Sequence, residues 1–193
     1  MILTISDLKL KFNNIIDIKG KISRDIKKGH LFPIVRGVYE TNSNVSGFYL
    51  SQYICGPSYL SFDYALYYYN LIPEKIYNTF TCATFDKRKI KRFENYFGTY
   101  IYRDVPKDVY HYGIDLIIDG EYSFHIATPE KALCDKLYTM TPIRSIKDLR
   151  SLLFDDLRID EDSFYNLNKN DLLFLAPLYK STNLNMLIKF LNK

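Results

Sequence analysis

The sequence has only three cysteines, three scattered histidines and no apolar run of membrane-spanning length. The number of cysteines is odd and no two are spaced as Cys-x-x-Cys, so we expect neither a disulfide framework nor a zinc site. No glycine-rich phosphate loop occurs, and the N-terminus lacks the basic-then-apolar pattern of a secretory signal. We therefore expect a cytoplasmic protein with no metal, no cofactor and no membrane partner.

Hydrophobic and aromatic residues are abundant instead. Hydrophobic residues make up 47% of the 193 residues, and the aromatic residues comprise 18 Tyr and 13 Phe with no Trp. This content is sufficient for a sizeable core, and tyrosine can lie at the edge of a core because it keeps a polar tip. The same tyrosines would also suit a protein interface or a nucleic-acid platform.

Positive charge is modest in total but clustered. The net charge is +4, yet residues 1–50 hold eight Lys and Arg against four Asp and Glu, and residues 85–107 hold seven against three. Clustered positive charge favours an acidic partner such as nucleic acid.

Residues 1–44 are predicted to form a small DNA-binding domain. A short helix is expected over Ser6–Phe12 with Ser6 as its cap, and a second over residues 18–28 with Gly29 as its C-cap. Apolar residues on both sides of Arg36-Gly37 predict two short strands joined by a tight turn. Helix, basic helix and hairpin is the order of a winged helix-turn-helix, although a full one usually has three helices before its wing.

The second predicted helix carries the side chains that we expect to contact DNA. Ile22 and Ile26 would face inward, which leaves the basic side chains on other faces. Lys and Arg attract phosphates, and Ser23 and Arg24 could reach base edges. The candidate DNA-binding residues are Lys21, Ser23, Arg24, Lys27, Lys28 and, in the hairpin, Arg36. The alternative is an ordinary solvated basic helix, and Asp25 would oppose a phosphate if it faced DNA.

Residues 45–193 are predicted to form a larger α+β body. Strand-like segments occur four times, and Asp119-Gly120 between the last two is a strong hairpin signal. These predicted strands are Tyr77–Phe85, Thr99–Val105, Gly113–Ile118 and Glu121–Ile126. We therefore expect a mostly antiparallel sheet of about four strands with packed helices, followed by a helical C-terminal part from about residue 141.

Helices are predicted around this sheet from their caps and apolar spacing. Phe48–Cys55 is expected to be helical, and a helix after Ser61 is expected to end at Asn70, which tolerates the left-handed conformation. The expected N-caps are Ser61, Thr128, Ser145 and Asp171.

A basic segment follows the first predicted strand. Its cationic residues are Lys87, Arg88, Lys89, Lys91 and Arg92. Such a segment could contact phosphate or an acidic partner surface, and a solvated loop is an equal alternative.

Five short motifs follow one another within residues 20–140. Lys-Lys-Gly and Arg-Gly-Val-Tyr occur within Lys27–Tyr39, and Tyr-Leu-Ser-x-x-x-Ala-Leu-x-x-x-x-Leu-Ile spans Tyr59–Ile72. The basic segment precedes Phe97-Gly98-Thr99, and Thr-Pro-Glu-Lys-Ala-Leu-x-Asp spans Thr128–Asp135. In this order the motifs resemble the AbiEi family of antitoxins.

The resemblance implies a two-part antitoxin that is not an enzyme. An N-terminal winged helix would bind operator DNA and repress its own operon, and the remainder would oppose a nucleotidyltransferase toxin encoded alongside it in phage defence. Two departures are Asn70, where the family commonly has Gly, and the short N-terminal part. The alternative is a stand-alone winged-helix transcriptional regulator without a toxin partner.

A metal-dependent nuclease is the enzyme alternative for a basic protein. Such enzymes need clustered carboxylates with a nearby lysine. Asp115, Asp119 and Glu121 lie on the predicted hairpin, but Glu130-Lys131 is adjacent rather than spaced as Glu-x-Lys. We expect Glu130 to serve as a helix N-terminal charge instead.

Overall fold

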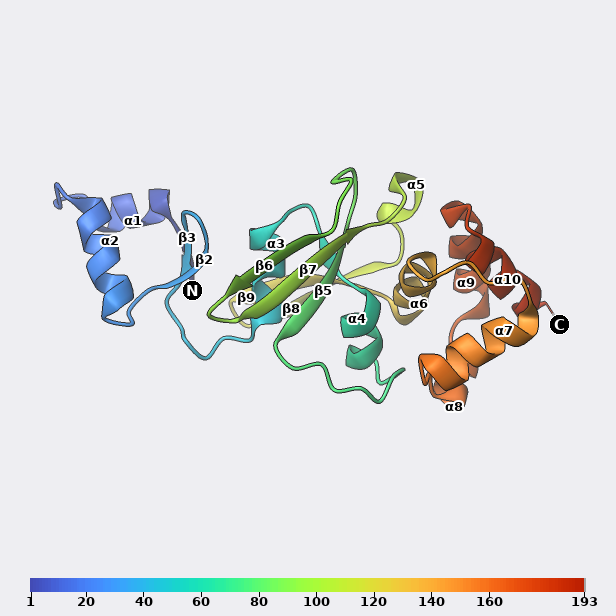
Figure 1. Ribbon diagram of the computed structural model, residues 1–193. Coiled ribbons are helices and arrows are strands. Elements are labelled where there is room, and N and C mark those ends of the chain that lie inside the picture. Colours follow the sequence, from blue (N-terminus) through green and yellow to red (C-terminus); the bar gives the residue numbers. More distant parts are fainter. Residues whose placement is uncertain (193) are drawn as a thin grey trace.

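The computed structural model describes residues 1–192 and has an α+β architecture, as predicted (Figure 1). A small N-terminal unit with its own sheet lies at one end, a six-stranded sheet lies in the middle, and a group of helices lies at the other end. No helix within residues 1–192 is both long enough and apolar enough to cross a bilayer.

The N-terminal unit combines three short strands with two helices. Its elements are β1 (Ile2–Thr4), α1 (Ile5–Lys11), α2 (Ile18–Lys27), β2 (Phe32–Val35) and β3 (Val38–Glu40). The strands are antiparallel in the order β1-β3-β2, so β3 lies between its hairpin partner and the strand that precedes both helices. The sequence predicts the two helices and the hairpin but not β1, because three residues give too short a pattern to read.

Local side-chain chemistry fixes the ends of these two helices. Thr4, not the expected Ser6, caps α1: the Thr4 hydroxyl accepts from the Asp7 N–H at 3.3 Å. The Asp7 carboxylate accepts in return from the Thr4 N–H at 2.7 Å, which completes a capping box. Gly29 follows α2 with φ of +71°, the left-handed conformation expected of a C-cap glycine.

The body is built around a mixed sheet with the strand order β6-β7-β5-β4-β9-β8. Its strands are β4 (Tyr59–Leu60), β5 (Thr79–Thr84), β6 (Lys91–Asn95), β7 (Gly98–Asp104), β8 (Ile114–Asp119) and β9 (Tyr122–Ala127). The predicted antiparallel hairpin β8–β9 is present. The sheet nevertheless has six strands rather than about four, and the pairs β5–β7 and β4–β9 are parallel.

The two unpredicted strands of the body have different causes. β4 is only two residues long, so it carries no readable alternation. β6 runs Lys-Arg-Phe-Glu-Asn, and the sequence presents it as part of the basic segment because Phe93 is its one apolar residue. It lies at the sheet edge, where charged side chains oppose pairing with another sheet.

Short helices accompany the sheet. They are the 3₁₀ turn η1 (Gly47–Leu50), α3 (Ser51–Ile54), α4 (Phe62–Tyr68), α5 (Lys107–Tyr110) and α6 (Pro129–Tyr138). The helix expected over Phe48–Cys55 is therefore a 3₁₀ turn followed by a single α turn. Thr128 caps α6 as predicted, its hydroxyl accepting from the Lys131 N–H, and Asn70 ends the α4 region with φ of +58°.

The C-terminal part is helical, as predicted. Its elements are α7 (Ile146–Ser151), the π-helical turn η2 (Leu152–Asp156), α8 (Glu161–Tyr165), α9 (Lys169–Leu175), the 3₁₀ turn η3 (Ala176–Tyr179) and α10 (Thr182–Leu191). Ser145 caps α7 as expected, but Asn168 rather than Asp171 caps α9. The buried Asn183 amide on α10 donates to the Leu137 carbonyl oxygen at 2.9 Å, which ties α10 to the end of α6.

Candidate nucleic-acid interface

The exposed face of α2 brings together four of the predicted DNA-binding residues. Ser23, Arg24, Lys27 and Lys28 are all exposed, and their spacing places them along one side of the helix. Ile22 on the opposite side is buried in the small core of the N-terminal unit. The face is therefore available to a partner and carries three positive charges and one hydroxyl.

The fifth predicted residue on α2, Lys21, has a different environment. Its ammonium lies 2.6 Å from the Asp25 carboxylate, which is buried, and 5.1 Å from the centre of the Phe12 ring. Asp25 thus points inward to Lys21 and away from the exposed face, so it does not oppose a phosphate there. Lys21 belongs to the interior side of α2, and its charge is already paired.

Arg36 lies in the two-residue turn between β2 and β3 and is exposed. Gly37 follows it with φ of +87°, and its carbonyl oxygen accepts from the Ile5 N–H at 3.0 Å. This bond holds the turn against the start of α1. The hairpin is therefore short and fixed, and Arg36 is its one cationic side chain.

The basic segment of residues 87–92 lies away from the N-terminal unit. At the far end of β6, Asn95 donates from its amide to the Ile34 carbonyl oxygen at 2.9 Å, so that end of the strand touches β2. The segment begins at the opposite end, where the Lys87 ammonium donates to the Gly56 carbonyl oxygen at 3.3 Å. The two basic clusters predicted from sequence are therefore not brought together.

One cation of this segment has an acidic partner, and the backbone of another is held by a carboxylate. Arg92 lies on β6 and forms an ion pair of 2.6 Å with Glu94, and the Arg88 backbone N–H donates to the Asp104 carboxylate at 2.6 Å. Lys89 and Arg88 expose their side chains in the loop. The segment is thus partly a sheet edge and partly a solvated loop.

A buried polar cluster joins the two body motifs, and the sequence alone does not reveal it. The Lys131 ammonium lies 2.8 Å from the Asp135 carboxylate, and neither side chain is exposed. The Ser61 hydroxyl donates to Asp135 at 2.7 Å, and the Tyr59 hydroxyl donates to the same oxygen at 3.0 Å. Tyr179, from the C-terminal helices, donates to the other carboxylate oxygen at 2.5 Å.

This arrangement explains why Ser61 makes no capping bond to α4: its hydroxyl is used by Asp135. Burial and the Asp135 charge raise the pKa of Tyr59 and Tyr179 well above the ordinary value. Both phenols therefore stay neutral and act as hydrogen-bond donors. The spacing of Lys131 and Asp135 by four residues within α6 is the signal that could have predicted the pair.

The carboxylates considered for a nuclease do not converge. Asp115, Asp119 and Glu121 are exposed along the β8–β9 hairpin, and Asp119 accepts a hydrogen bond from the Tyr49 hydroxyl. Glu130 is buried, and its carboxylate accepts from the Asn168 N–H at 2.9 Å, so it fixes the start of α9. Within residues 1–192 no group of three or more His, Cys, Asp or Glu residues is arranged to hold a metal ion.

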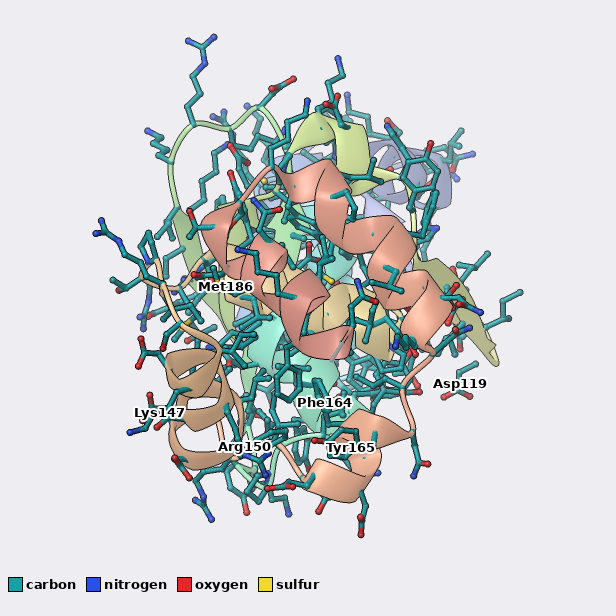
Figure 2. All side chains as sticks on the ribbon, turned by 90° about the vertical axis from the view of Figure 1, so that its right-hand side faces the viewer. Asp119, Lys147, Arg150, Phe164, Tyr165 and Met186 are labelled. Carbon is teal, nitrogen blue, oxygen red and sulfur yellow. The ribbon has the colours of Figure 1, made fainter. Side chains whose placement is uncertain are left out.

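The C-terminal helices contain a cavity of about 690 Å³ with a mixed aromatic and basic lining. Figure 2 shows Lys147 and Arg150 of α7 on the same side of the molecule as Phe164 and Tyr165 of α8.

No protein-family model matches the chain, and a search of curated proteins finds no significant relative.

Proposed function

We propose that the chain is a DNA-binding repressor of its own operon and the antitoxin of a toxin–antitoxin pair. The observation that carries the DNA-binding part is the exposed face of α2, where Arg24, Lys27 and Lys28 lie together with Ser23. Lys and Arg on one helix face attract phosphates, and Ser and Arg can hydrogen-bond base edges. Asp25 is buried against Lys21 and does not oppose a phosphate here, whereas the exposed N-cap residue Asp17 lies 4.0 Å from the Arg24 guanidinium and offsets part of its charge.

The elements around α2 agree with a winged helix. A strand, two helices and a hairpin follow one another, with the second helix presenting its basic side outward. In that design the second of the paired helices enters the major groove, and the hairpin contacts the backbone or the minor groove. Arg36 at the hairpin turn would then make the wing contact.

The antitoxin part of the proposal depends on the ordered motifs within residues 20–140. Its toxin would be a nucleotidyltransferase encoded beside it, as in the AbiEi-like systems that the motifs resemble. The buried cluster around Asp135 gives a physical reason for the motif residues Tyr59, Ser61 and Lys131, because all three contact that carboxylate. A lone regulator with the same DNA-binding unit is the second candidate.

A reporter placed behind the DNA upstream of the chain's reading frame tests repression. We expect the chain to lower reporter expression and Arg24→Ala/Lys28→Ala to restore it. The matched control is Lys147→Ala/Arg150→Ala, which likewise removes one lysine and one arginine, but from α7. Equal reporter expression with and without the chain would contradict the repressor proposal.

Co-expression with the neighbouring nucleotidyltransferase tests the antitoxin part separately. We expect the toxin alone to stop growth and the chain to restore it. If repression holds but growth is not restored, the lone-regulator candidate is favoured.

A further inference from the structure

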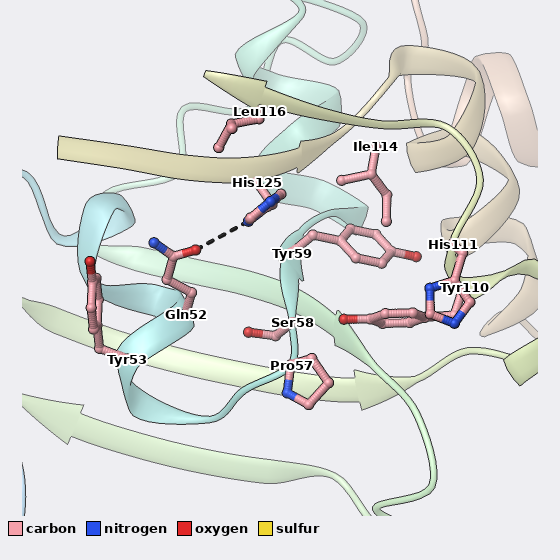
Figure 3. Close-up of a pocket in the computed structure, with 10 residues that line it drawn as sticks. All are labelled: Gln52, Tyr53, Pro57, Ser58, Tyr59, Tyr110, His111, Ile114, Leu116 and His125. Atoms are coloured by element: carbon pink, nitrogen blue, oxygen red, sulfur yellow. Dashed lines mark hydrogen bonds between the residues drawn. The ribbon is translucent and has the colours of Figure 1, made fainter. Parts of the chain in front are cut away.

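A cavity of about 660 Å³ opens on the body, and its lining residues come from α3, the start of β4, the end of α5 and the β8–β9 hairpin (Figure 3). This volume is typical of small-molecule sites. Ser58, Tyr59 and Tyr110 are buried and form its floor, whereas Tyr53 and His125 are exposed at its rim. None of the lining residues belongs to the N-terminal unit, so the cavity is separate from the proposed DNA-binding face.

The floor of the cavity contains a polar group without a partner. The Ser58 hydroxyl is buried, its residue being 7% exposed, and it has no hydrogen-bond partner in the described part of the chain. Buried hydroxyl groups are normally hydrogen-bonded, because leaving one unpaired costs free energy. Figure 3 shows the Tyr110 hydroxyl directed toward Ser58, whose own hydroxyl points away from Tyr110, so the floor presents two separate hydroxyls.

The wall above Ser58 holds a fixed amide and imidazole. The Gln52 amide nitrogen donates to the Ser123 carbonyl oxygen at 3.0 Å, which leaves the Gln52 amide oxygen to face His125 Nδ1 at 3.1 Å. That oxygen can only accept, so in neutral His125 the proton lies on Nδ1 and Nε2 is an acceptor. The wall thus offers an acceptor, while the floor offers hydroxyls that can donate or accept.

Aromatic rings provide flat surfaces around these polar groups. The Tyr59 and Tyr110 rings pack at 5.2 Å between centroids, and Tyr53 exposes its ring at the rim. Planar heterocycles stack on such rings, and their edges carry both donors and acceptors. This combination suits a nucleobase better than an aliphatic ligand.

The charge around the cavity suits an anionic substituent. The ten lining residues drawn in Figure 3 include no Asp or Glu. The Lys87 ammonium donates to the Gly56 carbonyl oxygen at 3.3 Å, next to the lining residue Pro57. Lys87 is not itself a lining residue, but this bond fixes its ammonium beside the residue that precedes Pro57, and a phosphate that extends from a bound base could reach it there.

We propose that this cavity binds the base of a nucleotide, with Ser58 and Tyr110 hydrogen-bonding the base edge and Lys87 contacting the phosphate. The base could belong to a free nucleotide or to a single-stranded nucleic acid, since both carry the same chemistry. The site is independent of operator binding by α2 and assigns a role to Lys87 that DNA binding does not require.

Isothermal titration calorimetry of the full chain with the four common nucleoside 5′-monophosphates tests this proposal. The corresponding nucleosides and short single-stranded oligonucleotides form the other two arms. We expect at least one monophosphate to bind, and Ser58→Ala to weaken it by about fivefold or more, as expected for loss of one hydrogen bond. Lys87→Ala should weaken the monophosphate but not its nucleoside, whereas the control Lys89→Ala in the same segment should change neither.

Tyr53→Ala provides a second variant, because this exposed rim residue can be truncated without opening the core. It should weaken both monophosphate and nucleoside through loss of stacking. Tighter binding of an oligonucleotide, with the same sensitivity to Ser58→Ala, would identify nucleic acid as the source of the base. The proposal is overturned if no monophosphate, nucleoside or oligonucleotide binds at millimolar concentration, or if binding is unaffected by Ser58→Ala, Tyr53→Ala and Lys87→Ala.

Discussion

The Lys131 ammonium and the Asp135 carboxylate lie 2.8 Å apart, one helical turn from each other on α6, with both side chains fully buried. The two charges would be costly alone, because burial removes the hydration of each ion. Here the carboxylate also accepts hydrogen bonds from Tyr59, Ser61 and Tyr179. The pair thus holds together the β4–α4 junction, α6 and the C-terminal helices.

Lys131→Met should lower the free energy of unfolding by about 3–5 kcal/mol, because it leaves the Asp135 charge buried without its counter-ion. Denaturant unfolding measures this loss. Lys136→Met on the same helix is the control: Lys136 pairs with the partly exposed Asp63 at 2.5 Å and should cost less than about 1 kcal/mol. Equal losses in the two variants would contradict the larger structural role assigned to the buried pair.

Folding stability should also fall in alkaline solution. Burial, followed by the Asp135 charge, raises the pKa of Tyr59 and Tyr179 above the ordinary value of 10.0, so the unfolded chain releases these protons first. The contribution to the free energy of unfolding is therefore fully present below pH 10 and is lost progressively above it. In a spectroscopic pH titration we expect the Tyr59 and Tyr179 phenols to ionise only as helical circular dichroism disappears. Ionisation of all tyrosines in one step with the fold intact would contradict this.

The loop of the basic segment should not contribute to operator affinity. The last residue of β6, Asn95, contacts Ile34 of the N-terminal unit. Arg88 and Lys89 lie beyond the opposite end of this strand. Arg88→Ala/Lys89→Ala should therefore leave the dissociation constant for upstream DNA unchanged, as measured by fluorescence anisotropy. A loss equal to that of Arg24→Ala/Lys28→Ala would mean that the DNA contacts both clusters.

The parts of the fold that follow local chemistry are the parts that sequence predicts. Thr128 and Ser145 cap the helices expected of them, Gly29 ends α2, and Asp119-Gly120 joins two antiparallel strands. Each of these signals acts over a few residues, so neighbouring residues are sufficient to read it.

The features that sequence does not predict depend on distant residues. The two residues of β4 become a strand only because β5 and β9 lie on either side, and the parallel pairing of β5 with β7 arises because β6 intervenes along the chain. Similarly, Ser61 has the sequence context of a helix cap, but Asp135, 74 residues away, takes its hydroxyl. The cavity beside Ser58 is likewise assembled from segments that the sequence keeps apart.

The candidate DNA-binding face was partly predictable. The spacing of Ser23, Arg24, Lys27 and Lys28 predicts a common exposed side, which the helix has. The ion pair between Lys21 and Asp25 was not predictable, because it depends on how α2 packs against the N-terminal core. This packing turns the Asp25 carboxylate inward.

DNA binding and repression are best tested by the affinity of the chain for the DNA upstream of its own reading frame, measured over a series of salt concentrations. We expect tighter binding to that DNA than to random DNA of equal length, and a steep loss of affinity with salt. Arg24→Ala/Lys28→Ala should weaken binding and reduce the salt slope by about one for each phosphate contact removed. Equal affinity for both DNAs, with no change in the variant, would contradict the proposed repressor.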